Sequence, residues 1–229
     1  MAQAAHFNKT ELPEYTRGEE IFNMVSHIAG GGLGFVALLF CVIIAAFNQH
    51  VTGIVSGIIY GLMVILLFTM SSIYHGLGIG KPKRVFRVLD HCTIYLLIAG
   101  TYTPILLTQF MRIYPADAWI MFGILWGLAI TGVTLTAIDR KRFKKFALVC
   151  YLGMGWMAVF RINRLINVLG AAFFILILIG GCLYTIGVIF YALGKKKKYM
   201  HSVFHLFVNA ASILHSVAIA IWVMPGEIL

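Results

Sequence analysis

Long runs of apolar residues separated by short polar stretches dominate this sequence. Seven such runs occur, near residues 21–47, 52–77, 86–110, 117–138, 145–161, 166–193 and 200–224. About 20 apolar residues in a helix cross the hydrocarbon core of a bilayer, whereas the strands of membrane barrels run about 10 residues and alternate in polarity. The pattern therefore predicts an all-α integral membrane protein, a bundle of seven transmembrane helices, and excludes a barrel.

The composition agrees with a membrane location. Of the 229 residues, 61% are apolar and 11% are charged, whereas soluble proteins carry about 25% charged residues. These values exclude a cytosolic enzyme and a secreted disulfide scaffold, and no nucleic-acid partner is expected. Residues 1–20 are polar and lack the basic start and short apolar core of a signal peptide. We therefore expect a short cytoplasmic segment, 1–20, followed by a membrane domain, 21–229.

The positions of the basic residues predict how the bundle is oriented. The chain has 18 Lys and Arg residues, and all but three lie at the amino end or after the second, fourth and sixth runs; the three are Arg112, Arg161 and Arg164. Cytoplasmic loops of membrane proteins carry an excess of such residues. The amino terminus is therefore expected in the cytoplasm and the carboxyl terminus outside. Omitting the short fifth run would place Lys195–Lys198 outside, so the charges also favour seven spans.

Polar side chains gather at the cytoplasmic ends of three predicted spans. Ser71 and His75 end the second span, Asp90 lies near the start of the third, and His201 and His205 start the seventh. Polar and ionisable groups inside a membrane are costly and by default mark a functional site. The three spans are far apart in the sequence but bring these five residues to the same membrane depth.

The spacing of the histidines points to metal binding. His201 and His205 are four residues apart, so they share one helix face and lie about 6 Å apart along its axis. With His75 they offer three imidazoles and leave a fourth position open, as in catalytic zinc sites. Copper, nickel and iron also accept imidazole ligands. Asp90 is placed to hold or deprotonate a water that the metal activates.

Each of these residues also has a structural explanation of its own. A His-x3-His pair at a helix start can be merely interfacial, and Asp90 can pair with Arg87 three residues earlier. Ser71 can bond to the backbone of its own helix. These explanations do not account for the shared depth of all five residues, whereas a metal site does.

A second polar stripe runs along the first span. It comprises Glu20, Asn23, His27, Gly30 and Gly34, which fall on one helix face. One interpretation is a polar helix start followed by a glycine seam for close packing. The other is a polar wall beside the metal, with His27 as a direct ligand only as a lesser alternative.

Two further histidines are predicted to lie outside the metal site. His215 is about 21 Å along the helix from His201, so we expect it to be buried and hydrogen-bonded elsewhere. His91 adjoins Asp90 and should point about 100° away from it.

The set Ser71-x3-His75, Asp90 and His201-x3-His205 on spans 2, 3 and 7 resembles the progestin and adipoQ receptor family. The short amino-terminal segment and the stretch Tyr151-Leu152-Gly153-Met154-Gly155-Trp156 are closer to its bacterial hemolysin III branch. The resemblance implies a zinc ion held by the three histidines, with Asp90 reaching it through a water and Ser71 beside it. It also implies a bacterial inner (plasma) membrane.

Several functions follow from these expectations. The first is an intramembrane zinc hydrolase of a lipid amide or ester, with Asp90 as general base and then acid and Ser71 orienting the water or substrate. The second is a non-catalytic, zinc-stabilised regulator of membrane homeostasis. The resemblance adds a pore-forming hemolysin, and histidines on separate helices admit haem. A membrane lipid is the expected substrate or ligand, and the oligomeric state does not follow from the sequence.

Overall fold

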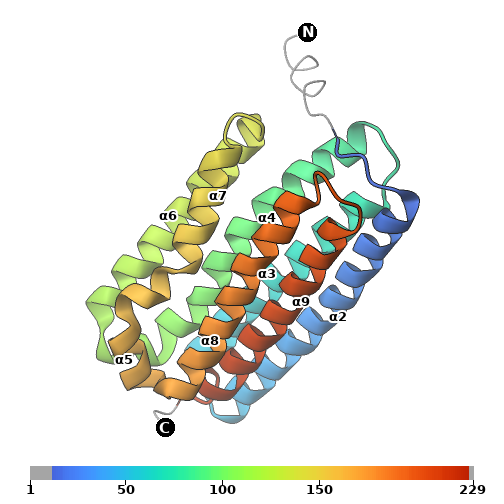
Figure 1. Cartoon of the computed structure of the whole chain (residues 1–229). Coiled ribbons are helices and arrows are strands. Elements are labelled where there is room, and N and C mark those ends of the chain that lie inside the picture. Colours follow the sequence, from blue (N-terminus) through green and yellow to red (C-terminus); the bar gives the residue numbers. More distant parts are fainter. Residues whose placement is uncertain (1–11, 227–229) are drawn as a thin grey trace.

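The computed structural model describes residues 12–226, and within them every regular element is a helix (Figure 1). In chain order the elements are α2 (Arg17–Phe47), α3 (Val51–Gly76), α4 (Lys81–Ile105), η1 (Leu106–Phe110), α5 (Met111–Ile113), α6 (Pro115–Asp139), α7 (Lys144–Gly155), η2 (Met157–Arg161), α8 (Ile162–Leu193), α9 (Met200–Ala218) and η3 (Ile219–Val223). The predicted all-α class is confirmed. Residues 1–11 of the predicted amino-terminal segment lie outside the described residues.

Six helical segments of the described chain are long and apolar enough to cross a membrane. They are Arg17–Phe47, Val51–Gly76, Lys81–Ile113, Pro115–Asp139, Lys144–Leu193 and Met200–Val223. Five of them agree with single predicted spans to within about five residues at each end, the precision expected of helix boundaries read from sequence. The other, Lys144–Leu193, is 50 residues long and contains both the fifth and the sixth predicted spans.

The segment Lys144–Leu193 is interrupted twice. Helix α7 ends at Gly155 and is followed by the 3-10 turn η2, and α8 has a break at Gly170, whose φ of 82° and ψ of 161° are not helical. Glycine tolerates this conformation because it has no β-carbon. Residues 162–165, the expected gap between the two predicted spans, are helical instead, so that boundary is wrong. In Figure 1 the chain runs away from the α6–α7 connection along α7 and returns along α8.

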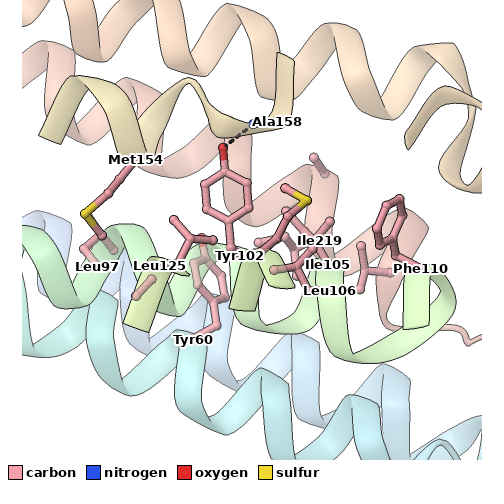
Figure 2. Packing of buried hydrophobic residues seen from close by; sticks show 14 of the residues in the cluster. Tyr60, Leu97, Tyr102, Ile105, Leu106, Phe110, Leu125, Met154, Ala158 and Ile219 are labelled. Carbon is pink, nitrogen blue, oxygen red and sulfur yellow. Dashed lines mark hydrogen bonds between the residues drawn. The ribbon is translucent and has the colours of Figure 1, made fainter. Parts of the chain in front are cut away.

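A tyrosine from α4 supports the interruption between α7 and η2. The Tyr102 hydroxyl donates to the Gly155 carbonyl at 2.9 Å. It also accepts from the Ala158 N–H at 2.9 Å (Figure 2). Unpaired backbone groups are costly in an apolar surrounding because no water is available to bind them. Tyr102 therefore satisfies the groups that the ending helix leaves unpaired, and it does so from within the buried core.

The start of α2 is fixed against the start of α9. Thr16 and Glu19 form a capping box, in which each side chain accepts a hydrogen bond from the other residue's backbone N–H. Glu19 Oε1 also accepts from the Tyr199 N–H at 2.7 Å, directly before α9. This contact aligns the polar stripe of α2 with the histidines at the start of α9.

The glycines of the α2 stripe lie at close helix contacts. A β-carbon at Gly30 would come within 2.3 Å of Asn209 Oδ1 and 2.6 Å of the Phe68 ring, and one at Gly34 within 2.8 Å of Val64. Small residues allow such an approach between membrane helices. The glycine half of the stripe therefore packs α2 against α3 and α9, as the seam interpretation predicted.

Candidate metal centre

Three histidines from α3 and α9 meet at the end of the bundle where α3 ends and α9 begins. One ring nitrogen from each of His75, His201 and His205 lies within 4.8 Å of the others, and all three residues are buried. His201 Nε2 and His205 Nε2 are 3.1 Å apart, which suits two ligands that each bind one zinc ion at about 2.0–2.1 Å. The donor set therefore fits a metal ion, and it comprises the three predicted ligands.

A carboxylate from α2 holds the ring of His75. His75 Nδ1 lies 2.6 Å from Glu20 Oε2, while His75 Nε2 has no hydrogen-bond partner. Metal-binding histidines generally donate their other ring N–H to a carboxylate or carbonyl, which fixes the orientation of the ring. Glu20 thus leaves Nε2 of His75 available for a metal. The sequence placed Glu20 on the polar stripe of α2 but did not pair it with His75, because helix periodicity does not identify partners on another helix.

Lys83 supports both Glu20 and the end of α3. Its Nζ lies 2.9 Å from Glu20 Oε1 and donates to the carbonyls of Tyr74 and Leu77 at 3.0 and 2.9 Å. A cation at a helix C-terminus stabilises the carbonyls that lack partners there. The residue is only 2% exposed, so its charge is compensated by Glu20 and by these carbonyls. In the sequence, Lys83 is only one of the basic residues that indicate orientation, and no local pattern predicts this contact with α2.

Ser71 and Asp90 lie in the same cavity as the α9 histidines. The cavity has a volume of ≈60 Å³, and Ser71, Asp90, His201 and His205 all line it. A cavity needs a volume of about 10–15 Å³ to hold one water molecule, so this cavity has room for a metal ion and a water molecule. The residues that the sequence placed at one membrane depth are also close together laterally.

Aromatic side chains complete the wall of this cavity. The Tyr15 ring stacks on His201 with centroids 5.0 Å apart, and His27 stacks on His205 at 3.7 Å. Burial raises the pKa of the Tyr15 hydroxyl, which therefore stays protonated. His27 lies beside the three-histidine group and not in it. His91 also lines the cavity but, as expected, is not part of the three-histidine group.

A larger apolar chamber adjoins the metal cavity. It has a volume of ≈160 Å³, and Leu67 and Ile94 line both spaces. Aromatic and aliphatic side chains of α4, α7 and α8 form most of its wall. His215 also faces the chamber and hydrogen-bonds the Ile177 carbonyl at 3.1 Å, in agreement with its predicted role outside the metal site.

Comparison with known proteins places the chain in a family. Residues 15–216 match the family described as "Haemolysin-III related". The chain belongs to this family. It is 35% identical to Hemolysin-3 of Bacillus cereus over 94% of this chain and 96% of that protein. It is 36% identical to the Hemolysin-3 homolog of Bacillus subtilis (strain 168) over 86% of this chain and 91% of that protein.

A human relative is more distant. The monocyte to macrophage differentiation factor of Homo sapiens is 27% identical over 70% of this chain and 67% of that protein. The family match, residues 15–216, contains the three histidines of the candidate metal centre together with Glu20 and Lys83. The resemblance to the haemolysin III family is therefore confirmed, and the protein is an integral membrane protein of that family.

Proposed function

We propose that this haemolysin III-related protein is a zinc-dependent hydrolase that cleaves an acyl amide or ester bond of a membrane lipid. The observation that carries the proposal is the buried three-histidine group beside a cavity that Asp90 and Ser71 line. Three histidine ligands leave one coordination position for water or substrate, which is typical of catalytic zinc and not of structural zinc. The adjoining apolar chamber supports a substrate with a hydrocarbon chain.

The roles of the residues follow from their positions. His75, His201 and His205 hold the metal, which when bound supplies Lewis-acid chemistry to a carbonyl and acidifies water. Asp90 accepts the proton of the attacking water and returns it to the leaving group. Ser71 lines the same cavity as Asp90 and orients the water or the substrate.

The proposed topology has seven crossings, with the amino end in the cytoplasm. The break at Gly170 supports two crossings within Lys144–Leu193. In Figure 1 the connections α3–α4, α6–α7 and α8–α9 lie at the same end of the bundle as the start of α2. Those connections and the helix ends beside them carry most of the basic residues, which is typical of the cytoplasmic side. The metal centre then lies in the cytoplasmic half of the membrane.

Replacement of Asp90 tests the enzymatic proposal. Wild-type protein in lipid nanodiscs is incubated with a panel of ceramides and glycerophospholipids, and free fatty acid is measured by mass spectrometry. Asp90→Asn should retain its metal and lose hydrolysis by about 100-fold or more, because general acid–base catalysis contributes about that much. A His201→Ala/His205→Ala variant should lose both metal and activity. Equal fatty-acid release by wild type and Asp90→Asn would contradict the mechanism.

A structural metal is the second candidate function. The three histidines connect α3 with α9, so a bound ion would hold two helices together. Binding energy at a structural zinc site is folding energy. This function predicts that chelation destabilises the protein while no lipid in the panel is turned over.

The name of the Bacillus relatives raises membrane lysis as a third candidate. Release of a dye from vesicles by the folded protein, above a heat-denatured control, would favour it. Dye retention together with hydrolysis of a lipid would favour the enzyme.

A further inference from the structure

A groove between α2 and α3 reaches the wall of the metal cavity. It has a volume of ≈540 Å³, and Ile28, Gly31, Ile65 and Thr69 are among the residues that line it. Ile28 is 56% exposed, so the groove opens toward the bilayer. His27 lines both the groove and the metal cavity and is the side chain that separates them.

The groove continues into a larger hollow at the end of the bundle where α2 begins. The hollow has a volume of ≈880 Å³, and Met24 and Leu77 line both spaces. Its wall carries the cations Arg17, Lys83 and Arg84 and two carboxylates, one of which is the partner of Lys83. Three cations thus face two carboxylates in this wall. The hollow is thus amphipathic with a positive balance.

The dimensions suit one membrane phospholipid. Arg17 and His27 are ten residues apart on α2, which corresponds to about 15 Å along the helix. If the headgroup of a phospholipid lies beside Arg17, its acyl chains lie in the apolar groove and extend past His27 toward the middle of the membrane. Basic residues near the cytoplasmic surface attract anionic lipids by about 1 kcal/mol each.

Polar atoms without partners lie where the groove meets the cavity. Both ring nitrogens of His27 lack hydrogen-bond partners, although the residue is only 3% exposed. Leaving such groups unpaired is costly. An ester, amide or hydroxyl group of a lipid that approached from the groove would satisfy them.

We infer that the hollow and the groove form one binding site for an anionic glycerophospholipid of the cytoplasmic leaflet. The headgroup occupies the hollow, one acyl chain lies between α2 and α3, and the acyl carbonyl faces His27. The lipid then reaches the metal cavity sideways from the bilayer, past His27. This last step rests on the proposed hydrolase function, whereas the binding site does not.

Two neighbouring glycines allow a matched test. A β-carbon at Gly31 would meet only Phe68 Cβ at 3.8 Å, and one at Gly32 would meet nothing within 4 Å. Gly31 lines the groove and Gly32 does not. Gly31→Phe should therefore fill the groove without displacing the backbone, while Gly32→Phe should project into the lipid. Thr69→Trp blocks the groove from the α3 side and serves as a second variant.

The experiment uses full-length protein in nanodiscs with photoactivatable phosphatidylglycerol, and cross-linked peptides are mapped by mass spectrometry. Label should fall on α2 and α3 in the wild type and decrease about tenfold in Gly31→Phe and Thr69→Trp, because displacing two methylenes corresponds to about that factor. Gly32→Phe should stay within about twofold of wild type. Metal content, measured on every variant, shows that the centre is intact.

Three outcomes would overturn parts of the inference. Equal labelling of Gly31→Phe and Gly32→Phe, or label confined to other helices, would overturn the groove. Equal labelling by photoactivatable phosphatidylcholine would overturn the headgroup assignment of the hollow. Hydrolysis that persists in Gly31→Phe and Thr69→Trp would overturn the sideways route. Groove labelling without hydrolysis of any lipid would contradict the hydrolase and leave the binding site supported.

Discussion

At the scale of the residue, the arrangement of the candidate metal centre depends on side chains outside the three-histidine group. Glu20 accepts from the ring of His75 on one oxygen and pairs with Lys83 on the other. Both histidine and lysine are almost fully buried, so removal of the carboxylate charge would leave the lysine uncompensated. The orientation of one ligand is therefore set by a residue on a different helix.

Replacement of Glu20 should weaken metal binding. Glu20→Gln retains the shape of the side chain but removes the charge that orients His75, and loss of such a partner typically lowers metal affinity 10–100-fold. Competition with a chromophoric chelator measures the dissociation constant. Glu14→Gln makes the same charge change in the wall of the hollow and should leave the affinity unaltered. Equal affinities for Glu20→Gln and wild type would show that His75 needs no partner.

At the scale of the element, close contacts decide where helices pack. On α6, a β-carbon at Gly132 would lie 2.3 Å from the Tyr95 ring of α4, whereas one at Gly127 meets nothing within 4 Å. Tyr95 is fully buried, so its ring cannot move without displacing other core residues. The α4–α6 interface thus requires a glycine at position 132, whereas position 127 has room for a larger residue.

This contrast predicts different effects for the same substitution. Gly132→Ala should lower the free energy of unfolding by about 1–3 kcal/mol through overpacking, and Gly127→Ala should not lower it. Both sites lie away from the histidines, so neither variant should lose metal. Denaturation in mixed detergent micelles, followed by circular dichroism, gives the comparison. A stable Gly132→Ala protein would mean that α4 and α6 are not packed as described.

The apolar runs predict the positions of the helices well, but they do not predict where a helix is interrupted. Every run except the short fifth one is long enough for a membrane helix that satisfies its own backbone hydrogen bonds, so the position of that helix follows from hydropathy alone. The break at Gly170 lies within an apolar stretch, where hydropathy does not change. The interruption after Gly155 depends on Tyr102 of α4, a contact that no local pattern contains.

At the scale of the whole molecule, the candidate metal centre brings together helices that are far apart in the sequence. Its histidines come from α3 and α9. Nearby, Glu19 of the capping box connects the start of α2 with the start of α9 by accepting from the Tyr199 N–H. An ion bound by the folded state only would stabilise the bundle by mass action. Both the hydrolase and the structural function share this consequence.

Removal of the metal should therefore lower the melting temperature. At a metal concentration 1,000 times Kd the stabilisation is about 4 kcal/mol, which corresponds to about 10 °C for a chain of this size. Differential scanning fluorimetry with and without a chelator measures the shift. The His201→Ala/His205→Ala variant should not respond to the chelator. No shift in the wild type would mean that the histidines hold no metal in the folded protein.

The number of crossings can be tested at the two ends of Lys144–Leu193. Lys141 and Lys196 are exposed and flank this segment. Two crossings place both positions in the cytoplasm, whereas one crossing places them on opposite sides. In a cysteine-free background, Lys141→Cys and Lys196→Cys should both resist a membrane-impermeant maleimide until the cells are permeabilised, and Gln49→Cys should react in intact cells. If Lys196→Cys reacts in intact cells and Lys141→Cys does not, the segment crosses the membrane only once.

The sequence by itself determined the helical class, the membrane location, the three histidines and their common depth with Ser71 and Asp90. Hydropathy, charge and helical spacing can be read directly from the order of residues in the chain. Because each span crosses the membrane, a residue's position in its span also gives its depth in the membrane. Only the tertiary structure decided which helices are neighbours: that Glu20 holds His75, that Lys83 caps α3, and that His27 separates the metal cavity from a groove facing the bilayer. Lateral contacts depend on how side chains from distant helices fit together, and no one-dimensional pattern encodes that fit.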